Sequence, residues 1–360
     1  MQIGLIGLPY SGKTTLFQTL TSVHIDAANA KRESNQAIVK VPDARLDKLT
    51  AMFNPKKKVN ANIEIVDIVG VQKGDSTSSQ FNSQFIGKVK TNDALIHVVR
   101  GFEDDTIPHP DGSINVLRDI ATIDDELLLT DMAFVEARLE KLEKDIMKQK
   151  DKDLVKREIA SMQRWQAHLE QNKPLRQLDF PEEERIYLKN YQPLTAKPLL
   201  IAVNMSDSNV SESAKFVADL KQQITGSKIS IEPFFAKIEQ ELSLLSDEEK
   251  AVFMEEYGLS DSPLDRMLGS AYHLLGLQSF FTVGEDECRA WTIRKGMTAQ
   301  DAAGVIHTDF YNKFIRAEVV SYENLIDAGS YAKCKEKGTF RLEGKDYICN
   351  DGDILNIRHG

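Results

Sequence analysis

The sequence predicts an α/β domain with a mainly parallel sheet, an α-helical hairpin inserted into that domain, and a small C-terminal domain of mixed α and β structure. Three observations lead to this fold class. Short apolar runs alternate with helical segments in the N-terminal part of the chain, and a glycine-rich turn follows the first run. A long charged segment without glycine or proline interrupts this alternation. The last part of the chain is rich in glycine, β-branched and aromatic residues.

Four short apolar runs are expected to form strands of the α/β domain. They cover residues 2–6, 61–70, 93–99 and 198–204, and such runs are typical of buried parallel strands. Residues 13–20 carry apolar side chains at helical spacing and predict a helix directly after the glycine-rich turn. Strand–helix alternation of this kind favours a sheet covered by helices.

The charged segment from residue 124 to residue 171 predicts a coiled-coil hairpin. Its apolar positions follow a heptad pattern, which stops at a polar run around residues 149–153 and then resumes. We expect two antiparallel helices, with the polar run as a solvated turn; a contact with a partner is the alternative. The first half of the heptad seam consists of Leu128, Met132, Val135, Leu139, Leu142 and Ile146.

The C-terminal region predicts a β-grasp-like or other α+β domain with short strands separated by turn signals. The resulting boundaries are residues 1–122 and 192–278 for the α/β domain, 123–191 for the inserted hairpin and 279–360 for the C-terminal domain. The expected C-terminal strands are residues 280–283, 290–293, 314–320, 339–342, 346–349 and 354–357.

Bulk composition sets limits on location and partners. The 360 residues carry a net charge of −10, which argues against non-specific coating of nucleic acid but leaves room for a local basic surface. No apolar run approaches the roughly 18 residues of a membrane span, and the N-terminus lacks the basic region of a signal peptide. The three cysteines are far apart, which indicates free thiols rather than a zinc site. We expect a cytoplasmic protein, and a monomer.

The glycine-rich turn, GLPYSGKT, matches the phosphate-binding pattern GxxxxGK[ST] and lies between a predicted strand and a predicted helix. Glycines let backbone N–H groups point at phosphate oxygens, and the helix adds the positive end of its dipole. Lys13 is expected to neutralise the β- and γ-phosphates, and Thr14 to offer its hydroxyl to Mg²⁺. A turn that binds nothing is the disfavoured alternative. The predicted phosphate contacts are Gly7, Leu8, Pro9, Tyr10, Ser11, Gly12, Lys13, Thr14 and Thr15.

A second motif, DIVG, ends the second predicted strand and fits the DxxG pattern of GTPase-like proteins. Asp67 is expected to reach Mg²⁺ through water, and Gly70 to direct its N–H to the γ-phosphate, which gives it a catalytic role beside Lys13. Val71 follows where many GTPases carry a glutamine that orients the attacking water. We therefore expect hydrolysis to be slow, or to depend on another group or a partner.

The sequence NMSD, from Asn204 to Asp207, ends the fourth predicted strand where GTPases carry NKxD. Asn204 and Asp207 fit that pattern, but Met205 replaces the lysine whose stem covers the base. An aspartate there reads guanine, whereas loss of the lysine argues against guanine. The alternative for Asp207 is a helix cap. Ala236 and Lys237 occupy the place of the loop that closes over the base.

With these motifs in view, the chain resembles the YchF/Obg-like ATPase family of Obg-related G proteins, whose phosphate loop reads GLPNVGKSTLF where this chain has GLPYSGKTTLF. The resemblance implies a Ras-like G domain, an inserted helical domain and a C-terminal TGS domain with a β-grasp core. It also implies ribosome or RNA association and a preference for ATP over GTP. Other matching blocks are VPDARLDKL, DIVGVQKGDS, DALIHVVR, AKIEQEL, RAWTIRKG, AAGVIHTDF, FIRAEV and RLEGKDY.

This chain departs from the family pattern at three positions. Tyr10 stands where the family usually has asparagine, Lys31 where its first switch has threonine, and Asp207 where its base motif ends in glutamate. The main hypothesis is a Mg²⁺-dependent, slow ATPase, or alternatively GTPase, acting as a ribosome-associated switch. A non-hydrolysing, nucleotide-gated RNA- or ribosome-binding module is the second hypothesis. A small-molecule kinase is disfavoured, because the insertion predicts a hairpin instead of an acceptor lid.

Three further features have local interpretations. His97 lies inside an apolar run and is expected to be a packed core histidine, and Trp165 is expected in the hairpin core. A basic set in the C-terminal region, with aromatic residues nearby, predicts a surface that faces RNA. That set consists of Arg289, Arg294, Lys295, Lys313 and Arg316.

Overall fold

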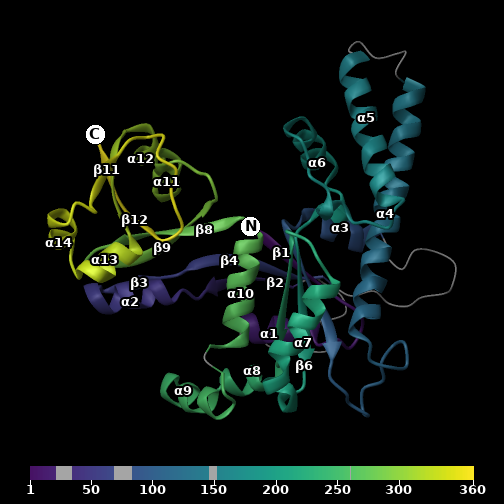
Figure 1. The fold of residues 1–360 in the computed structure, drawn as a ribbon, viewed down its shortest axis with the longest axis horizontal. Coiled ribbons are helices and arrows are strands. Elements are labelled where there is room, and N and C mark those ends of the chain that lie inside the picture. Colours follow the sequence, from purple (N-terminus) through teal and green to yellow (C-terminus); the bar gives the residue numbers. More distant parts are fainter. Residues whose placement is uncertain (22–34, 69–82, 146–151, 260) are drawn as a thin grey trace. The chain divides into compact units, whose positions relative to one another are not determined.

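The computed structural model describes residues 1–21, 35–68, 83–145, 152–259 and 261–360 (Figure 1). By its internal contacts the chain forms two compact units. The first consists of Met1–Ala37 and Glu64–Ser270, and the second of Ile38–Ile63 and Ala271–Gly360. The domain boundaries drawn from the sequence remain a prediction. They do not anticipate the grouping of residues 38–63 with the C-terminal region.

Most of one six-stranded sheet belongs to the first unit, and its central strands are parallel, as the sequence predicts; residues 38–41 and 61–63 of its strands group with the second unit. The three central strands are almost fully buried, which explains their continuous apolar runs. The two outermost strands were not predicted, because their sequences, NQAIVKV and ISIEPF, mix polar and apolar residues. In spatial order the strands are β2 (Asn35–Val41), β4 (Ala61–Asp67), β1 (Gln2–Ile6), β5 (Ala94–Gly101), β6 (Leu199–Met205) and β7 (Ile229–Phe234).

Helices complete the first unit, and three of them share one hydrophobic core with the strands through Phe85, Val89, Val217, Leu220, Ile238 and Leu242. The predicted helix after the glycine-rich turn is α1, which buries Leu16, Phe17 and Leu20. This confirms the α/β fold class. The helices are α1 (Lys13–Thr21), α3 (Ser83–Thr91), α7 (Val210–Gln223), α8 (Ala236–Leu242), α9 (Asp247–Glu256) and α10 (Pro263–Leu274), whose last turn enters the second unit.

The inserted segment forms a helical hairpin of α4 (Val116–Asp145) and α5 (Lys152–Leu169), which lie side by side in Figure 1. The predicted seam is buried between them at Leu128, Val135, Leu139 and Leu142. Trp165 is fully buried in the same core, and its indole N–H donates to Glu184 at 3.0 Å. Both the hairpin and the core position of Trp165 are confirmed. The short helix α6 (Arg185–Tyr191) leads back to the sheet.

The second unit is built on a mixed six-stranded sheet, as expected for an α+β domain. Helices α2 (Ala44–Phe53), α11 (Ala299–Ile306), α12 (Thr308–Asn312), α13 (Tyr322–Ala328) and α14 (Tyr331–Glu336) belong to this unit. In spatial order its strands are β11 (Arg341–Glu343), β10 (Phe314–Ser321), β12 (Asp353–His359), β8 (Leu277–Val283), β9 (Glu287–Arg294) and β3 (Lys57–Val59).

One predicted C-terminal strand, residues 346–349, is wrong. Its backbone groups bond irregularly to the segment before α11: Ala299 N–H donates to the Tyr347 carbonyl, and Cys349 N–H donates to the Met297 carbonyl. Only an isolated bridge between Thr298 and Ile348 resembles strand pairing there. The segment serves as a brace for the start of α11, and its apolar pattern reflects that packing.

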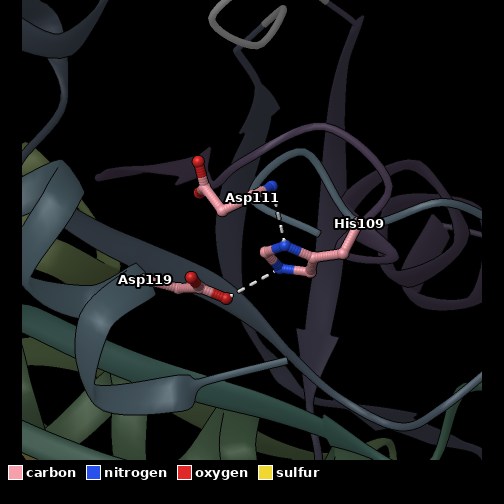
Figure 2. A group of neighbouring side chains, drawn as sticks. All are labelled: His109, Asp111 and Asp119. Atoms are coloured by element: carbon pink, nitrogen blue, oxygen red, sulfur yellow. Dashed lines mark hydrogen bonds and ion pairs between the residues drawn. The ribbon is translucent and has the colours of Figure 1, made fainter. Parts of the chain in front are cut away.

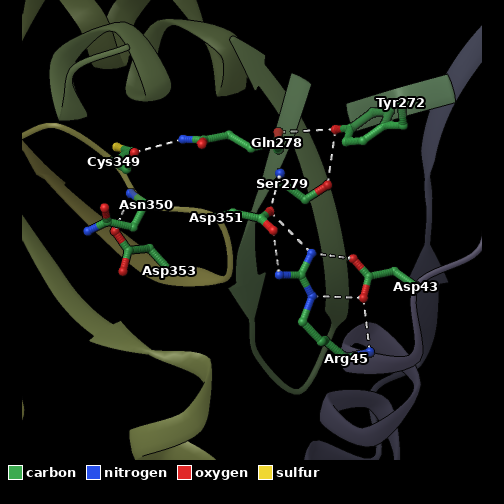
Figure 3. Close-up of polar contacts among 9 residues, drawn as sticks. All are labelled: Asp43, Arg45, Tyr272, Gln278, Ser279, Cys349, Asn350, Asp351 and Asp353. Carbon is green, nitrogen blue, oxygen red and sulfur yellow. Dashed lines mark hydrogen bonds and ion pairs between the residues drawn. The ribbon is translucent and has the colours of Figure 1, made fainter. Parts of the chain in front are cut away.

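An arginine holds α2 to the sheet within the second unit (Figure 3). The guanidinium of Arg45 donates to Asp43, the N-cap of α2, and to Asp351, which precedes β12. Asp351 also accepts from the backbone N–H of Ser279 at 2.9 Å. Charge-assisted bonds of this kind fix geometry as well as adding stability. They explain how the VPDARLDKL block becomes part of a unit formed mainly by C-terminal residues.

Candidate functional site

A cavity of about 650 Å³ in the first unit is the candidate site. Its lining residues follow the carboxyl ends of β1, β5, β6 and β7, and this is the edge where open α/β sheets bind ligands. The volume is typical of small-molecule sites. Every predicted nucleotide contact among the described residues lines the cavity except Gly7 and Asp207, whereas Gly70 lies outside those residues.

Two glycines give the phosphate loop its shape. Gly7 and Gly12 have φ angles of 155° and 95°. A Cβ on Gly7 would lie 2.4 Å from the Val98 carbonyl oxygen, and one on Gly12 would lie 2.3 Å from the Asn204 amide nitrogen. Neither position accepts a side chain, so the glycines of the motif are required by close approach as well as by conformation.

Tyr10 occupies the middle of this loop in a left-handed conformation, with φ of 63°, and its side chain is 63% exposed. Asparagine adopts this conformation more readily than other residues with a side chain. An asparagine would therefore suit this position, and Tyr10 adopts the left-handed conformation with its ring turned largely to solvent.

Lys13 and Asp67 form the charged pair of the site. Lys13 is the first residue of α1, and burial lowers the pKa of its ammonium, while the negative charge of Asp67 acts in the opposite direction. Burial raises the pKa of Asp67, and Lys13 and Lys88 oppose that shift. A bound polyphosphate would favour the protonated form of Lys13, because an opposite charge nearby stabilises the ammonium.

The residues present fit a magnesium ion. Asp67 is 4% exposed, and its Oδ1 has no hydrogen-bond partner among the described residues. A buried carboxylate oxygen without a donor is costly, and a hydrated cation would satisfy it. Asp67 does not itself line the cavity, whereas Thr14 does, so a hydroxyl and a more distant carboxylate are available. Oxygen ligands of this kind are those that Mg²⁺ prefers.

Asn204 links the phosphate loop to the start of α8. Its side chain is buried, and its Nδ2 donates to the Ser11 carbonyl at 3.2 Å. Its Oδ1 accepts from the backbone N–H of Ala236 at 3.3 Å. One amide thus ties the phosphate loop to the start of α8, where Ala236 and Lys237 line the cavity.

Sequence reasoning missed the segment after β5. Phe102, Glu103, Asp104 and Ile107 all line the cavity, as do Ser206 and Gln240 elsewhere. The segment follows a predicted strand, so the rule that ligands bind at the carboxyl ends of parallel strands was a signal for its proximity. The sequence does not reveal the exact contacts that shape it.

The buried side chain of Arg100 shapes that segment. Its guanidinium donates to the carbonyls of Phe102 at 3.1 Å, Ile107 at 2.9 Å and Asp104 at 3.3 Å, and it lies 4.6 Å from the centre of the Phe102 ring. One charged group therefore satisfies three loop carbonyls. Because the loop has little regular structure of its own, these bonds determine where Phe102 meets the cavity.

Asp207 lies beside the cavity but not on it. It begins a short 3₁₀ helix, Asp207–Asn209, whose N-cap is Ser206. The Asp207 carboxylate accepts from the backbone N–H of Ser208 at 3.1 Å and from the Ser206 hydroxyl at 3.0 Å. Both of these carboxylate contacts are with neighbouring residues in the sequence.

Some sequence-based assignments fall elsewhere. Gly70, Val71 and Lys31 lie outside the described residues. His97 is buried in β5, as expected of a core histidine, and neither ring nitrogen has a hydrogen-bond partner among the described residues. Burial lowers the pKa of His97 to about 3, so the ring is neutral at physiological pH.

A cluster of His109, Asp111 and Asp119 brings possible metal ligands together (Figure 2). The backbone N–H of Asp111 donates to His109 Nδ1 at 3.1 Å, so the ring proton lies on Nε2 and is donated to Asp119 at 2.9 Å. Arg118 donates to the other oxygen of Asp119. Both ring nitrogens and both oxygens of Asp119 are used. The cluster therefore fastens the segment after β5 to the first turn of α4.

Family models and related proteins together match almost the whole chain. The model of a family described as 50S ribosome-binding GTPase matches residues 2–205, and the model of the YchF-GTPase C-terminal family, described as a protein of unknown function, matches residues 277–360. The ribosome-binding ATPase YchF of Bacillus subtilis (strain 168) is 42% identical, with 99% of this chain and 98% of that protein covered. This chain belongs to the YchF/Obg-like ATPase family.

Further relatives extend the YchF/Obg-like family match to eukaryotes. Obg-like ATPase 1 of Caenorhabditis elegans is 37% identical, with 99% of this chain and 91% of that protein covered. The structure of a YchF GTPase from Schizosaccharomyces pombe aligns with a TM-score of 0.85 at 32% identity, over 99% of this chain and 97% of that one. Among the described residues, no helix combines the length and apolar character needed to cross a bilayer.

Proposed function

We propose that this chain is a Mg²⁺-dependent nucleoside triphosphatase that hydrolyses ATP in preference to GTP, slowly, and acts as a ribosome-associated switch. The observation that carries the proposal is the single cavity in which the phosphate loop, Asn204 and the start of α8 meet. Relatives named ribosome-binding ATPase support both the nucleotide and the ribosomal partner, and with them a cytoplasmic location.

The chemical step rests on positioning and charge. Lys13 and the loop N–H groups hold the β- and γ-phosphates and stabilise the charge that develops on them in the transition state. Thr14 and Asp67 would hold Mg²⁺, which when bound neutralises phosphate charge. Gly70 is assigned to the γ-phosphate by the DxxG motif alone. Val71 has no group that orients water, and this supports slow turnover.

The base end of the cavity supports a preference for ATP over GTP. Phe102, Ile107 and Met205 give this part of the cavity apolar walls. Apolar walls hold either purine by stacking and contact. A carboxylate that pairs with the guanine N1–H and N2–H₂ would favour GTP, but Asp207 is not among the lining residues. The ATPase names of the relatives point the same way.

A second candidate is a non-hydrolysing module that binds RNA or the ribosome, most simply as a monomer, under nucleotide control. The observation that favours it is Tyr10, because its exposed ring stands where the family has a polar amide within the phosphate loop. Turnover distinguishes the two candidates, since the second predicts none under any condition.

The test has two parts. Nucleotide-stripped protein is titrated by calorimetry with the Mg²⁺ complexes of non-hydrolysable ATP and GTP analogues, and tighter binding of the ATP analogue is expected. ATP and GTP turnover is then measured with and without ribosomes and K⁺. Tighter GTP binding would reverse the assigned base preference. Absence of turnover in every condition would replace the switch ATPase by the binding module.

A further inference from the structure

A second cavity, of about 320 Å³, lies in the first unit away from the nucleotide cavity. Its lining residues immediately precede β5, β6 and β7 or come from the segment around α6. Since these strands are parallel, their amino ends lie at the opposite edge of the sheet from the nucleotide cavity. We call this cavity the lysine pocket.

Positive charge dominates the lysine pocket. Lys90, Lys189, Lys197 and Lys228 line it, and Asp93 is its one acidic lining residue. None of the four ammonium groups lies within 4.0 Å of a carboxylate belonging to the part of the chain that the structure describes. Four like charges gathered in a concavity repel one another unless an anion joins them.

Aromatic rings hold two of these lysines in place. The Lys90 ammonium lies 5.2 Å from the centre of the Phe134 ring, and the Lys228 ammonium lies 5.2 Å from the centre of the Phe180 ring. Cation–π contacts of this kind restrict a flexible side chain without neutralising its charge. The rings thus position two of the four cations, while nearby carboxylates such as Asp179 and Asp131 act on the lysines without forming an ion pair.

Lys197 forms the buried base of the pocket. It is 9% exposed, and its ammonium donates to the Lys90 carbonyl at 2.9 Å and to the Asn92 carbonyl. An ammonium group has three N–H donors, so one remains for a ligand. Burial lowers the pKa of Lys197 to about 8, with Lys90 acting in the same direction and Asp93 and Asp131 against it. An anion in the pocket would reverse this shift.

Asn92 adds an unused acceptor. It lines the pocket, is 2% exposed, and its Oδ1 has no hydrogen-bond partner among the described residues. Its Nδ2 already donates to the Lys88 carbonyl. This oxygen is itself covered, so it lies behind the pocket wall, where its negative partial charge adds to the backbone carbonyls around Lys197.

We propose that the lysine pocket is a second ligand site, which binds a small phosphate-bearing anion. The cavity volume suits a phosphate and a few attached atoms, and the side chains of Phe180 and Leu188 give it apolar walls. An RNA strand is disfavoured, because proteins bind strands along extended basic grooves with exposed stacking platforms, whereas these amines gather around one cavity.

The test uses the full chain with Mg²⁺ and a saturating non-hydrolysable ATP analogue, so that the phosphate loop is already engaged. Inorganic pyrophosphate is titrated, and backbone amide shifts are followed by NMR. Saturable shifts are expected at Asn92 and Lys228, with Gly12 and Lys13 unchanged. The double variant Lys90→Gln/Lys228→Gln is expected to weaken pyrophosphate binding about tenfold or more, as loss of two charged contacts predicts.

The matched control is Lys215→Gln/Lys221→Gln, which removes the same charge from exposed positions on α7 of the same unit. Its pyrophosphate affinity is expected to stay within about twofold of wild type, since surface charges act weakly at a distance. If the first variant does not fold, the exposed Lys189→Gln replaces it. Equal weakening by the control, no saturable shift at the pocket, or shifts only with a single-stranded RNA oligonucleotide would each overturn the proposal.

Discussion

The phosphate end and the base end of the nucleotide cavity are built in different ways. The phosphate end comes from one continuous loop, residues 7–14, whose shape depends on two glycines and on the start of α1. The base end comes from three separate segments, after β5, after β6 and at the start of α8, which Arg100 and Asn204 hold in place. Local sequence therefore encodes the proposed phosphate site, while the proposed base site is a property of the tertiary structure.

The largest effect is expected at the phosphate end, from Lys13→Ala. Loss of a partly buried ammonium at the proposed phosphate site should weaken ATP and GTP binding alike, by about 100-fold or more. Calorimetry with non-hydrolysable analogues measures the change, and circular dichroism checks the fold. Unchanged affinity in a folded variant would remove the loop from the binding site.

The next largest effect concerns Glu239, a titratable residue of the helix that lines the base end of the cavity. Glu239, on α8, is 4% exposed, and its carboxylate accepts from the backbone N–H of Leu264 at 3.0 Å and from the Ser262 hydroxyl. The pKa of Glu239 is raised to about 7, and burial is the largest of the several causes of this shift. The folded protein therefore holds a proton between about pH 4.5 and pH 7 that the unfolded chain releases, and stability falls as the pH rises through this window.

The variant Glu239→Gln should remove that pH dependence. Above pH 7 the ionised, buried carboxylate lowers the unfolding free energy of the wild type by about 3 kcal/mol. The neutral amide of the variant has no such cost. We expect the stability of the variant relative to wild type to rise by about that amount between pH 5 and pH 8. Urea unfolding at several pH values measures it, with the exposed Glu241→Gln on the same helix as control. Parallel pH profiles for wild type and Glu239→Gln would contradict the expectation.

A smaller effect is expected from Phe102→Ala at the base end. The ring lines the cavity and is backed by the Arg100 guanidinium at 4.6 Å, so it offers a face for a purine. Loss of a stacking face is worth about 1–3 kcal/mol, which corresponds to about tenfold in affinity for either purine nucleotide. Affinity for inorganic triphosphate, which has no base, should stay the same. Equal weakening for triphosphate and ATP would place Phe102 away from the base.

The same contrast explains what the sequence could predict. The phosphate loop and the hairpin seam were visible because their patterns are local: a glycine–lysine motif in one, a heptad in the other. Arg100 gave no signal, since its three carbonyl partners are defined only by the folded loop. For the same reason the brace formed by residues 346–349 resembled a strand, and the pairing of β3 with β9 was not foreseen.

The smallest effect is expected from Asp207→Asn, although the sequence motif gives this residue the main part in reading a base. In the structure its carboxylate accepts hydrogen bonds from Ser206 and Ser208 and is absent from the cavity lining. Asparagine can accept the same local bonds. Affinities for ATP and GTP analogues, measured by calorimetry, should therefore each change less than about twofold. A selective loss of GTP binding would instead show that Asp207 reads guanine, and that the base end rearranges when nucleotide binds.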